Sequence, residues 1–285
     1  MNFYLHCRGI QMKLKTLAIA VAMASVPFAA QADLDIGGDV TVGYFGNSVG
    51  DNELLSIGSE LTLSADEKVG QITYFGSVTA NFDDALLGGG IGTDDLYVGL
   101  RGNFGEVRLG DTDNGCDAVD TGWVADDEFL SHNSGGCAGS DQNNITYKRS
   151  MGPATVAVSH SPNGSEYNAI GVSGSFGPVS ASLGYEAGDE LGDSDKNVVI
   201  GLSGKVGMFD LGVRASRADD EETLVGYTAK YTAGPNKMYV GFGENDSTFL
   251  GYQRALSGKT TMIVEYADQD GYDEAEYAVA LKHDF

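Results

Sequence analysis

Apolar and polar residues alternate along most of this chain. Val40, Val42 and Tyr44 share one face of an extended segment, and Thr41 and Gly43 occupy the other. A side-chain period of two predicts β-strands, and no segment has a convincing helical period. The pattern predicts about 16 strands. These span residues 34–46, 53–66, 69–82, 92–102, 104–112, 142–150, 153–160, 167–176, 178–188, 195–204, 206–217, 223–233, 236–244, 246–257, 259–270 and 273–285.

The connections between these strands alternate between short turns and longer acidic loops. The longest loop runs from 113 to 141. Strict alternation is typical of an up-and-down barrel, whereas a soluble sandwich has no reason to place its acids on every second connection. The predicted short turns are Glu67-Lys68, Gly102-Asn103, Ser150-Met151-Gly152, Gly177, Gly204-Lys205, Gly234-Pro235 and Ser257-Gly258.

Bilayer physics then predicts the fold. Every backbone amide in hydrocarbon must be paired, so a sheet there must close on itself. A barrel of about 16 strands is too wide for side chains to fill and leaves an aqueous channel. The fold class is therefore all-β, a transmembrane antiparallel up-and-down β-barrel. Aromatic residues near strand ends predict an interfacial girdle, comprising Tyr44, Phe75, Phe82, Tyr97, Phe104, Tyr147, Phe176, Tyr185, Phe209, Phe242, Tyr252 and Phe285.

The first 32 residues read as an export signal. Lys13 and Lys15 form a basic start after Met12, the apolar stretch 17–28 follows, and Ala30-Gln31-Ala32 is a small-residue cleavage site. We expect translation to start at Met12, with residues 1–11 as an upstream artefact or an extended basic region. Residues 33–285 would then form a single barrel domain in the cell outer membrane of a Gram-negative bacterium.

Charge narrows the range of partners. Residues 1–32 hold three basic residues and no acids, so residues 33–285 carry 41 acidic and 14 basic residues, a formal net charge of −27. Nucleic acid is excluded as a partner because its phosphates would be repelled. The acidic stretches 219–222 and 268–274 offer loose sites for Ca²⁺, although a solvated acidic rim explains them better. Gly89 to Leu96 matches a calcium-binding repeat that needs stacked copies, but it occurs once.

Two cysteines remain after export, Cys116 and Cys137, both in the longest connection. An even number of cysteines in an oxidising compartment favours a disulfide. Two unpaired thiols are the alternative. A bridge closing a loop of about 20 residues would stabilise the chain by roughly 3 kcal/mol in the chain-entropy model.

Three motifs resemble a known family. Residues 102–110 (GNFGEVRLG) are similar to the hairpin before the third loop of Gram-negative general-diffusion porins. Residues 143–150 (NNITYKRS) resemble the strand after that loop, and the final Leu281 to Phe285 resembles the family's ending. The resemblance implies a homotrimer in outer-membrane lipid, and a C-terminal strand ending at Phe285 that the barrel-assembly machinery reads. The acidity and the two loop cysteines depart from the family pattern.

In this family the third loop folds inward and narrows the pore, which places the constriction loop here at about 112–143. Loop acids would face basic residues on the barrel wall. Flanking apolar residues put Arg108 and Lys148 on the lumen face, and we expect these two to lie opposite loop acids at the narrowest point. The candidate constriction residues are Arg108, Lys148, Glu106, Asp117, Asp120, Asp126, Asp127, Arg101, Arg214 and Lys230.

The sequence thus predicts a porin for passive diffusion of small hydrophilic solutes and ions, with a preference for cations. A solute-specific channel is the alternative within transport. A secreted acidic calcium-binding β-protein or adhesin is the alternative from another class. No catalytic constellation stands out, since the histidines are scattered and nucleophile-elbow, zinc-helix and phosphate-loop motifs are missing from the sequence. We expect no enzyme activity and no cofactor.

Overall fold

The computed structural model describes residues 33–47, 52–56, 58–82, 91–125, 129–130, 136–137, 143–162, 167–188, 195–219, 221–243, 247–268 and 275–285. The predicted export signal, residues 1–32, lies outside these ranges. No helix in the described part of the chain is long and apolar enough to cross a membrane.

The described residues form 17 strand segments in a single sheet. They are β1 (Asp33–Asn47), β2 (Asn52–Ser56), β3 (Glu60–Val69), β4 (Ile72–Asn81), β5 (Gly92–Gly102), β6 (Gly105–Asp111), β7 (Asn144–Met151), β8 (Ala154–Ser161), β9 (Tyr167–Phe176), β10 (Val179–Gly188), β11 (Lys196–Val206), β12 (Phe209–Ala218), β13 (Leu224–Ala233), β14 (Asn236–Phe242), β15 (Thr248–Ala255), β16 (Thr260–Asp268) and β17 (Glu276–Asp284).

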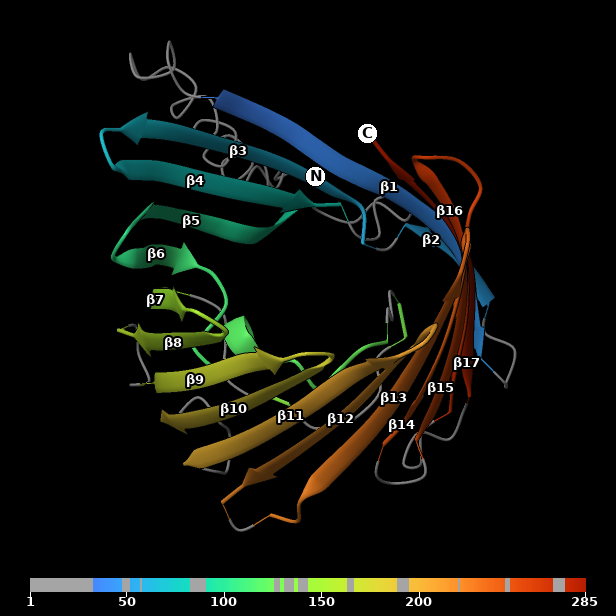
Figure 1. Ribbon diagram of the computed structural model, residues 1–285. Coiled ribbons are helices and arrows are strands. Elements are labelled where there is room, and N and C mark those ends of the chain that lie inside the picture. Colours follow the sequence, from blue (N-terminus) through green and yellow to red (C-terminus); the bar gives the residue numbers. More distant parts are fainter. Residues whose placement is uncertain are drawn as a thin grey trace, which may run out of the picture.

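The sheet closes into a barrel, as predicted (Figure 1). Apart from β2 and β3, strands adjacent in sequence pair antiparallel, and β1 pairs with β17, with Val42 opposite Leu281. The backbone amide of the last residue, Phe285, donates to the Gly38 carbonyl at 3.0 Å. Both β2 and β3 pair with β1. They act as one interrupted strand, so the barrel has 16 strands.

A bulge separates β2 from β3. Val42 lies opposite Ser56, whereas Asp39 lies opposite Glu60, so this strand carries one extra residue. The Ser59 hydroxyl fills the gap in the ladder. It accepts from the Thr41 amide at 2.9 Å and donates to the Thr41 carbonyl at 3.2 Å.

The two faces of the wall differ as the alternation predicted. On β9, Ile170 and Val172 are exposed on the outer face, while Ala169 and Gly171 are buried inside. The same alternation recurs around the barrel and leaves a band of exposed aliphatic and aromatic side chains outside. Bilayer hydrocarbon is the environment such a band requires.

Two members of the predicted aromatic girdle face the lumen instead. Phe75 follows the inward parity of the buried Ser77 and Thr79, and Tyr97 pairs with Gly110 at the base of the third loop. Strand parity, rather than position near a strand end, decides which face a side chain occupies.

Two predicted turns were also misplaced. β3 continues to Val69 and turns at Gly70, and β11 continues to Val206 and turns at Gly207. These glycines have φ of 65° and 64°. That left-handed conformation is readily adopted only by glycine among ordinary residues, so it fixes the turn.

The third loop connects β6 to β7 and spans residues 112–143. It contains a short 3-10 helix, η3 (Asp117–Val119), that lies inside the barrel beside β8, β9 and β10 (Figure 1). The predicted inward-folded loop is therefore present, and its attachment to the wall defines the candidate site.

Candidate functional site

The third loop lies flat against the inner wall of β8 to β12. A methyl group added to Gly115 would stand 2.6 Å from the Ala169 carbonyl oxygen, and one added to Gly122 would stand 2.7 Å from the Val213 carbonyl oxygen. Such distances leave no room for a side chain. The loop backbone therefore touches the strand backbone directly at both places.

The wall provides this space with four glycines, one on each of β9 to β12: Gly171, Gly184, Gly201 and Gly212. A Cβ at any of the four would collide with a loop atom; at Gly201 it would lie 2.7 Å from the Gly122 nitrogen. None of the four has a positive φ. Glycine is required here for close approach rather than for backbone conformation. We call these residues the glycine seat.

Wall hydroxyls satisfy the loop's backbone amides next to the glycine seat. The bonds run from the Gly115 amide to Ser159 Oγ (2.8 Å), from the Thr121 amide to Ser182 Oγ (3.2 Å) and from the Val124 amide to Thr228 Oγ1 (3.2 Å). A buried amide without a partner costs about 1–3 kcal/mol. These hydroxyls therefore replace the hydrogen bonds that a regular element would supply.

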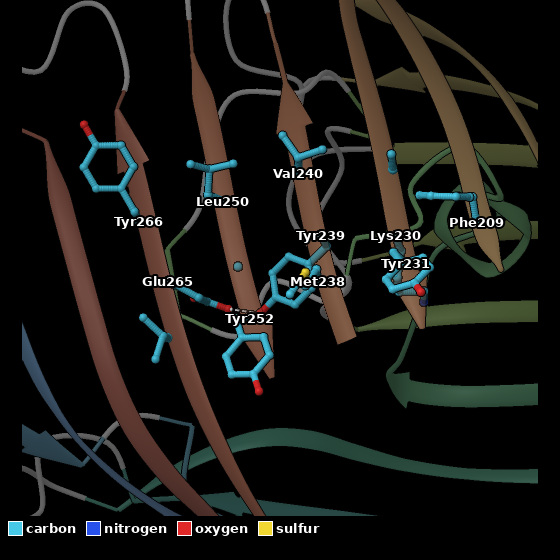
Figure 2. Close-up of a pocket in the computed structure, with 13 residues that line it drawn as sticks. Phe209, Lys230, Tyr231, Met238, Tyr239, Val240, Leu250, Tyr252, Glu265 and Tyr266 are labelled. Carbon is cyan, nitrogen blue, oxygen red and sulfur yellow. Dashed lines mark hydrogen bonds between the residues drawn. The ribbon is translucent and has the colours of Figure 1, made fainter. Parts of the chain in front are cut away.

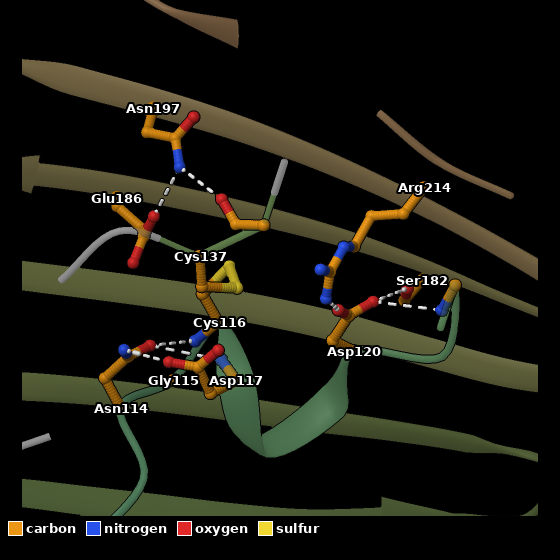
Figure 3. The surroundings of a disulfide bond; sticks show 12 residues. Asn114, Gly115, Cys116, Asp117, Asp120, Cys137, Ser182, Glu186, Asn197 and Arg214 are labelled. Carbon is orange, nitrogen blue, oxygen red and sulfur yellow. Dashed lines mark hydrogen bonds and ion pairs between the residues drawn. A yellow bond between two sulfur atoms is a disulfide. The ribbon is translucent and has the colours of Figure 1, made fainter. Parts of the chain in front are cut away.

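Cys116 and Cys137 form a disulfide, which confirms that prediction (Figure 3). Their Cα atoms are 5.9 Å apart and their sequence separation is 21. Cys116 is buried, with its sulfur over the Gly184 position of the glycine seat. The bridge joins the start of the loop to its returning half, so both halves are held on the same part of the wall.

A buried carboxylate lies beside the disulfide (Figure 3). Glu186 is fully buried on the lumen face of β10. It accepts hydrogen bonds from the Tyr167 hydroxyl (2.5 Å) and the Asn197 side-chain amide (2.7 Å). The same Asn197 nitrogen donates to the Gly136 carbonyl at 2.9 Å, next to Cys137. The wall therefore binds the returning half of the loop through Asn197.

The middle of the loop is held by an ion pair. Asp120 accepts from Arg214 Nη1 at 2.9 Å, and the two side chains are only 14% and 18% exposed. The Arg214 guanidinium also lies 5.0 Å from the centre of the Trp123 ring. A pair this enclosed is screened less than a surface pair. Arg214 therefore neutralises a loop acid between loop and wall.

The far side of the loop reaches the opposite part of the barrel. The amides of Phe129 and Leu130 donate to Glu265 Oε2 at 3.0 and 3.2 Å. The Tyr239 hydroxyl donates to Glu265 Oε1 at 2.8 Å. Leu130 packs with Tyr239, Phe249, Ala267 and Ala278 in a buried apolar cluster. The loop thus crosses the lumen and is anchored at both ends.

The expected basic wall lies on β5, β6 and β7, beside the base of the loop. Arg108 and Lys148 line one small recess with Glu106, Asp113 and Ala118. Arg108 Nε is 2.7 Å from Glu106 Oε1. The structure therefore brings Arg108, Glu106 and Lys148 together next to the third loop.

Two lumen-facing rings extend this basic wall. The Arg108 guanidinium lies 4.9 Å from the centre of the Tyr97 ring, and that of Arg101 lies 5.1 Å from the Phe75 ring. Arg101 also pairs with Asp66 at 3.1 Å, with both side chains well exposed. Stacked guanidinium groups keep a defined direction while remaining charged. We call Phe75, Tyr97, Arg101 and Arg108 the arginine–aromatic wall.

The remaining candidates are placed as follows. Asp117 lies in η3 and accepts from the Asn114 side-chain amide at 2.5 Å. Lys230 lies on the inner parity of β13, opposite Asp210 on β12. Asp126 and Asp127 lie outside the described residues.

Residues that the sequence reasoning missed are the glycine seat, Glu186 and Glu265. Each carboxylate had a recognisable pattern, an acid on the inward parity of a strand with outward aromatic or aliphatic neighbours. The glycine seat had none, because abundant glycine is equally consistent with bulged strands.

Potential metal ligands are sparse among the residues that the structure describes. One group brings together Cys116, Cys137 and Glu186. Both sulfurs are already bonded to each other, and the carboxylate is held by Tyr167 and Asn197. The acidic stretch 268–274 and the start of the calcium-repeat motif lie mostly outside the described ranges.

Comparison with solved structures gives the same architecture. The in-vitro folded OmpT of Vibrio cholerae in its trimer form aligns with a TM-score of 0.74 and 13% identity, covering 90% of this chain and 100% of that one. A triple mutant of the Rhodopseudomonas blastica porin gives 0.71 and 14%, covering 89% and 100%. At such identities the likeness concerns the fold alone.

Sequence comparison identifies relatives in Halomonas. A monosaccharide porin of Halomonas sp and the major outer membrane protein of Halomonas elongata are each 32% identical over 136 residues. The match covers 40% of this chain and 36% of each relative, so it spans about a third of the curated relatives' length.

A profile of the Gram-negative porin family matches residues 16–275, nearly the whole chain. This match excludes the secreted calcium-binding protein or adhesin considered above, and it points to a channel fold rather than an enzyme. With a closed 16-stranded barrel, an apolar outer face and an inward third loop, this chain belongs to the Gram-negative porin family of the outer membrane.

Proposed function

We propose that the barrel is a water-filled channel through which small hydrophilic solutes and ions diffuse passively. The observation that carries this proposal is the third loop, which is anchored across the lumen from the glycine seat to Glu265. A barrel of 16 strands without such a loop would enclose a wide aqueous channel. A fixed loop reduces it to a pore with a defined size limit.

In this proposal the constriction lies between the third loop and the arginine–aromatic wall. Arg101, Arg108 and Lys148 supply the positive side. Asp117 belongs to the negative side, and so do Asp126 and Asp127 by sequence. Asp120 and Arg214 cancel each other's charge beneath the loop, so their main role is to position it. Glu106 sets the direction of Arg108, and Lys230 adds a lumen cation further along the wall.

The pore is expected to prefer cations. Residues 33–285 carry 41 acids against 14 basic residues. Of the basic residues, Arg101, Arg108, Arg214 and Lys282 each lie within 4 Å of a carboxylate. Excess charge of one sign around a narrow aqueous path concentrates the opposite ion.

Planar-bilayer recording with size-graded permeation tests this function. Refolded protein should give stepwise ohmic conductance, and liposomes containing it should swell in small sugars but not in large oligosaccharides. Insertion without conductance, or conductance with no size limit, would contradict a pore narrowed by the loop.

A monosaccharide-specific channel is the second candidate. Two observations favour it: the relative named a monosaccharide porin, and the lumen position of the Phe75 and Tyr97 rings, where aromatic faces suit sugar rings. Saturable uptake of a monosaccharide that is lost in Phe75→Ala with Tyr97→Ala would favour specificity. Linear uptake in both proteins would favour general diffusion.

The assembly partners follow from the same proposal. We expect a homotrimer, because the OmpT structure that this barrel resembles is a trimer form. We expect export through a cleaved signal over residues 1–32, and recognition of the Phe285 strand by the barrel-assembly machinery. We also expect function in outer-membrane lipid without a cofactor.

A further inference from the structure

The outer face of the barrel has a hollow on β12 to β16 (Figure 2). Its volume is about 490 Å³, within the range of small-molecule sites. Its floor is made by Ala229, Val240 and Leu250, which lie side by side on neighbouring strands. Around the floor lie the aromatic residues Phe209, Tyr231, Tyr252 and Tyr266, together with Met238 and Val264.

Parity places this hollow outside the barrel. Leu250 and Met238 are exposed, whereas Phe249, next to Leu250 on β15, is fully buried on the lumen side and packs with Leu130 of the third loop. The hollow therefore opens toward the bilayer rather than toward the aqueous lumen.

The hollow spans the middle of β14 and β15, with Met238 and Tyr252 nearer the short turns and Val240 and Leu250 nearer the longer loops. Phe209 directly follows the turn at Gly207, and Arg254 lies two residues before the last short turn. Four residues of a tilted strand separate Arg254 from Leu250, which is about 10 Å of membrane depth. The hollow thus extends from beside Arg254, on the short-turn side that is periplasmic in the porin orientation, toward the middle of the bilayer.

A positively charged residue, Arg254, lies at the headgroup end of the hollow. Arg254 continues the outward parity of Leu250 and Tyr252, is exposed, and forms no ion pair within the described part of the chain. Opposite it on β14 is Asn236, whose side-chain oxygen accepts from the Tyr252 hydroxyl at 2.8 Å. The Asn236 side-chain nitrogen donates to the Ala233 carbonyl at 3.2 Å, so Arg254 is the group at this end that remains to meet a headgroup.

From this juxtaposition we infer that the hollow on β12–β16 binds one anionic glycerophospholipid, with an acyl chain on the Ala229–Val240–Leu250 floor and its phosphate at Arg254. An apolar recess alone would accept any acyl chain. Arg254 adds charge complementarity on a protein whose net charge of −27 otherwise repels anionic headgroups. This binding goes beyond solute diffusion and does not depend on the proposed selectivity.

Native mass spectrometry of the full chain, released from bilayers of phosphatidylglycerol and phosphatidylcholine, tests the site. The wild-type protein should retain one phosphatidylglycerol in preference to phosphatidylcholine. Arg254→Ala should lower phosphatidylglycerol retention about five-fold, the effect of one interfacial cation, and leave phosphatidylcholine retention unchanged. Ala229→Trp should fill the floor and lower retention of both lipids.

Arg149→Ala is the matched control. Arg149 is also an exposed, outward-facing cation near a short turn, but it lies on β7, away from the strands β12 to β16 that form the hollow. Equal losses in Arg149→Ala and Arg254→Ala would overturn the proposal. So would unchanged lipid retention in Ala229→Trp. Dissociation of the oligomer by Ala229→Trp, without any lipid loss, would show that a second copy of the chain covers the hollow.

Discussion

The lumen wall has two halves that are built differently. Under the third loop, β8 to β13 present small residues, with glycines where the loop backbone touches and hydroxyls where its amides need partners. Across the lumen, β3 to β6 present long charged and aromatic side chains, including Arg101 at 49% exposure. The first half holds the loop backbone, whereas the second meets the loop only near its base, beside Asp113 and Ala118.

Arginine has a different role in each half of the wall. Arg214 is enclosed with Asp120 and Trp123 and helps hold the loop. Arg108 stacks on Tyr97 at the lumen side and keeps its charge near the solute path. Both were equivalent candidates by strand parity. Their contacts now predict opposite phenotypes, one structural and one electrostatic.

The largest expected effect comes from filling the glycine seat. Val at Gly184 and Gly201 would meet Cys116 and the Gly122 backbone, and overpacking costs about 1–3 kcal/mol per site. We expect the loop to lift into the lumen, lowering single-channel conductance and increasing its noise.

Gly37→Val is the matched control for the glycine seat. Gly37 shares the inward parity of Asp39 and Thr41 on β1, and a Cβ there meets nothing within 4 Å. Equal conductance changes in the control and in the Gly184→Val, Gly201→Val variant would show that the covered wall is not specialised for the loop.

The second largest effect should come from breaking the enclosed Asp120–Arg214 ion pair. Arg214→Met leaves Asp120 charged and largely buried. This change should lower the stability of the loop on the barrel wall by about 2–3 kcal/mol. Hydrogen exchange of the Thr121 amide, which donates to Ser182 Oγ at 3.2 Å, should accelerate about 30- to 140-fold. Adding Asp120→Leu should restore most of the protection. Unchanged exchange in Arg214→Met would mean that the pair does not hold the loop.

Replacing Arg108 and Lys148, the cations of the wall that the loop leaves open to water, should change ion selectivity and little else. Arg108→Ala with Lys148→Ala exposes the excess acid at the constriction, so cation preference should increase. Folding should change by only about 0–1 kcal/mol, because partly exposed pairs contribute little. Reversal potential and heat-modified gel migration measure the two quantities. If the double variant unfolds more easily while its ion selectivity stays constant, then Arg108 and Lys148 have a structural role and do not set the selectivity.

Reducing the disulfide should have the smallest effect on the barrel. The strand ladders close without it, and hydroxyl bonds and the Asp120–Arg214 pair still hold the loop. Thermal stability of the barrel should therefore stay nearly constant, while open-channel noise rises because the returning half loses its link to Cys116. A large fall in barrel stability on reduction would show that the loop braces the wall.

The sequence predicted the barrel well because local alternation determines it. Most strand ends agree within about two or three residues, and the shifted turns at Gly70 and Gly207 depend on where the chain adopts a positive φ. The third loop was also placed correctly, at 112–143. Its location between β6 and β7 needed only the motifs on either side.

The contacts inside the barrel could not be predicted in the same way. Asp120 and Arg214 are 94 residues apart, and Phe129 and Glu265 are 136 apart. Their pairing depends on the path of a loop that has no periodicity of its own. Parity identified which side chains face inward, but not which of them the loop covers.

The reversal potential of the wild-type pore in a potassium chloride gradient is the most direct test of the account. With the loop fixed across the lumen from the glycine seat to Glu265 and the excess acid left along the water path, potassium should be more permeant than chloride at low salt. The preference should weaken toward 1 M, where the screening length is about 3 Å. Chloride permeating faster than potassium at low salt would contradict the proposed constriction and its charge.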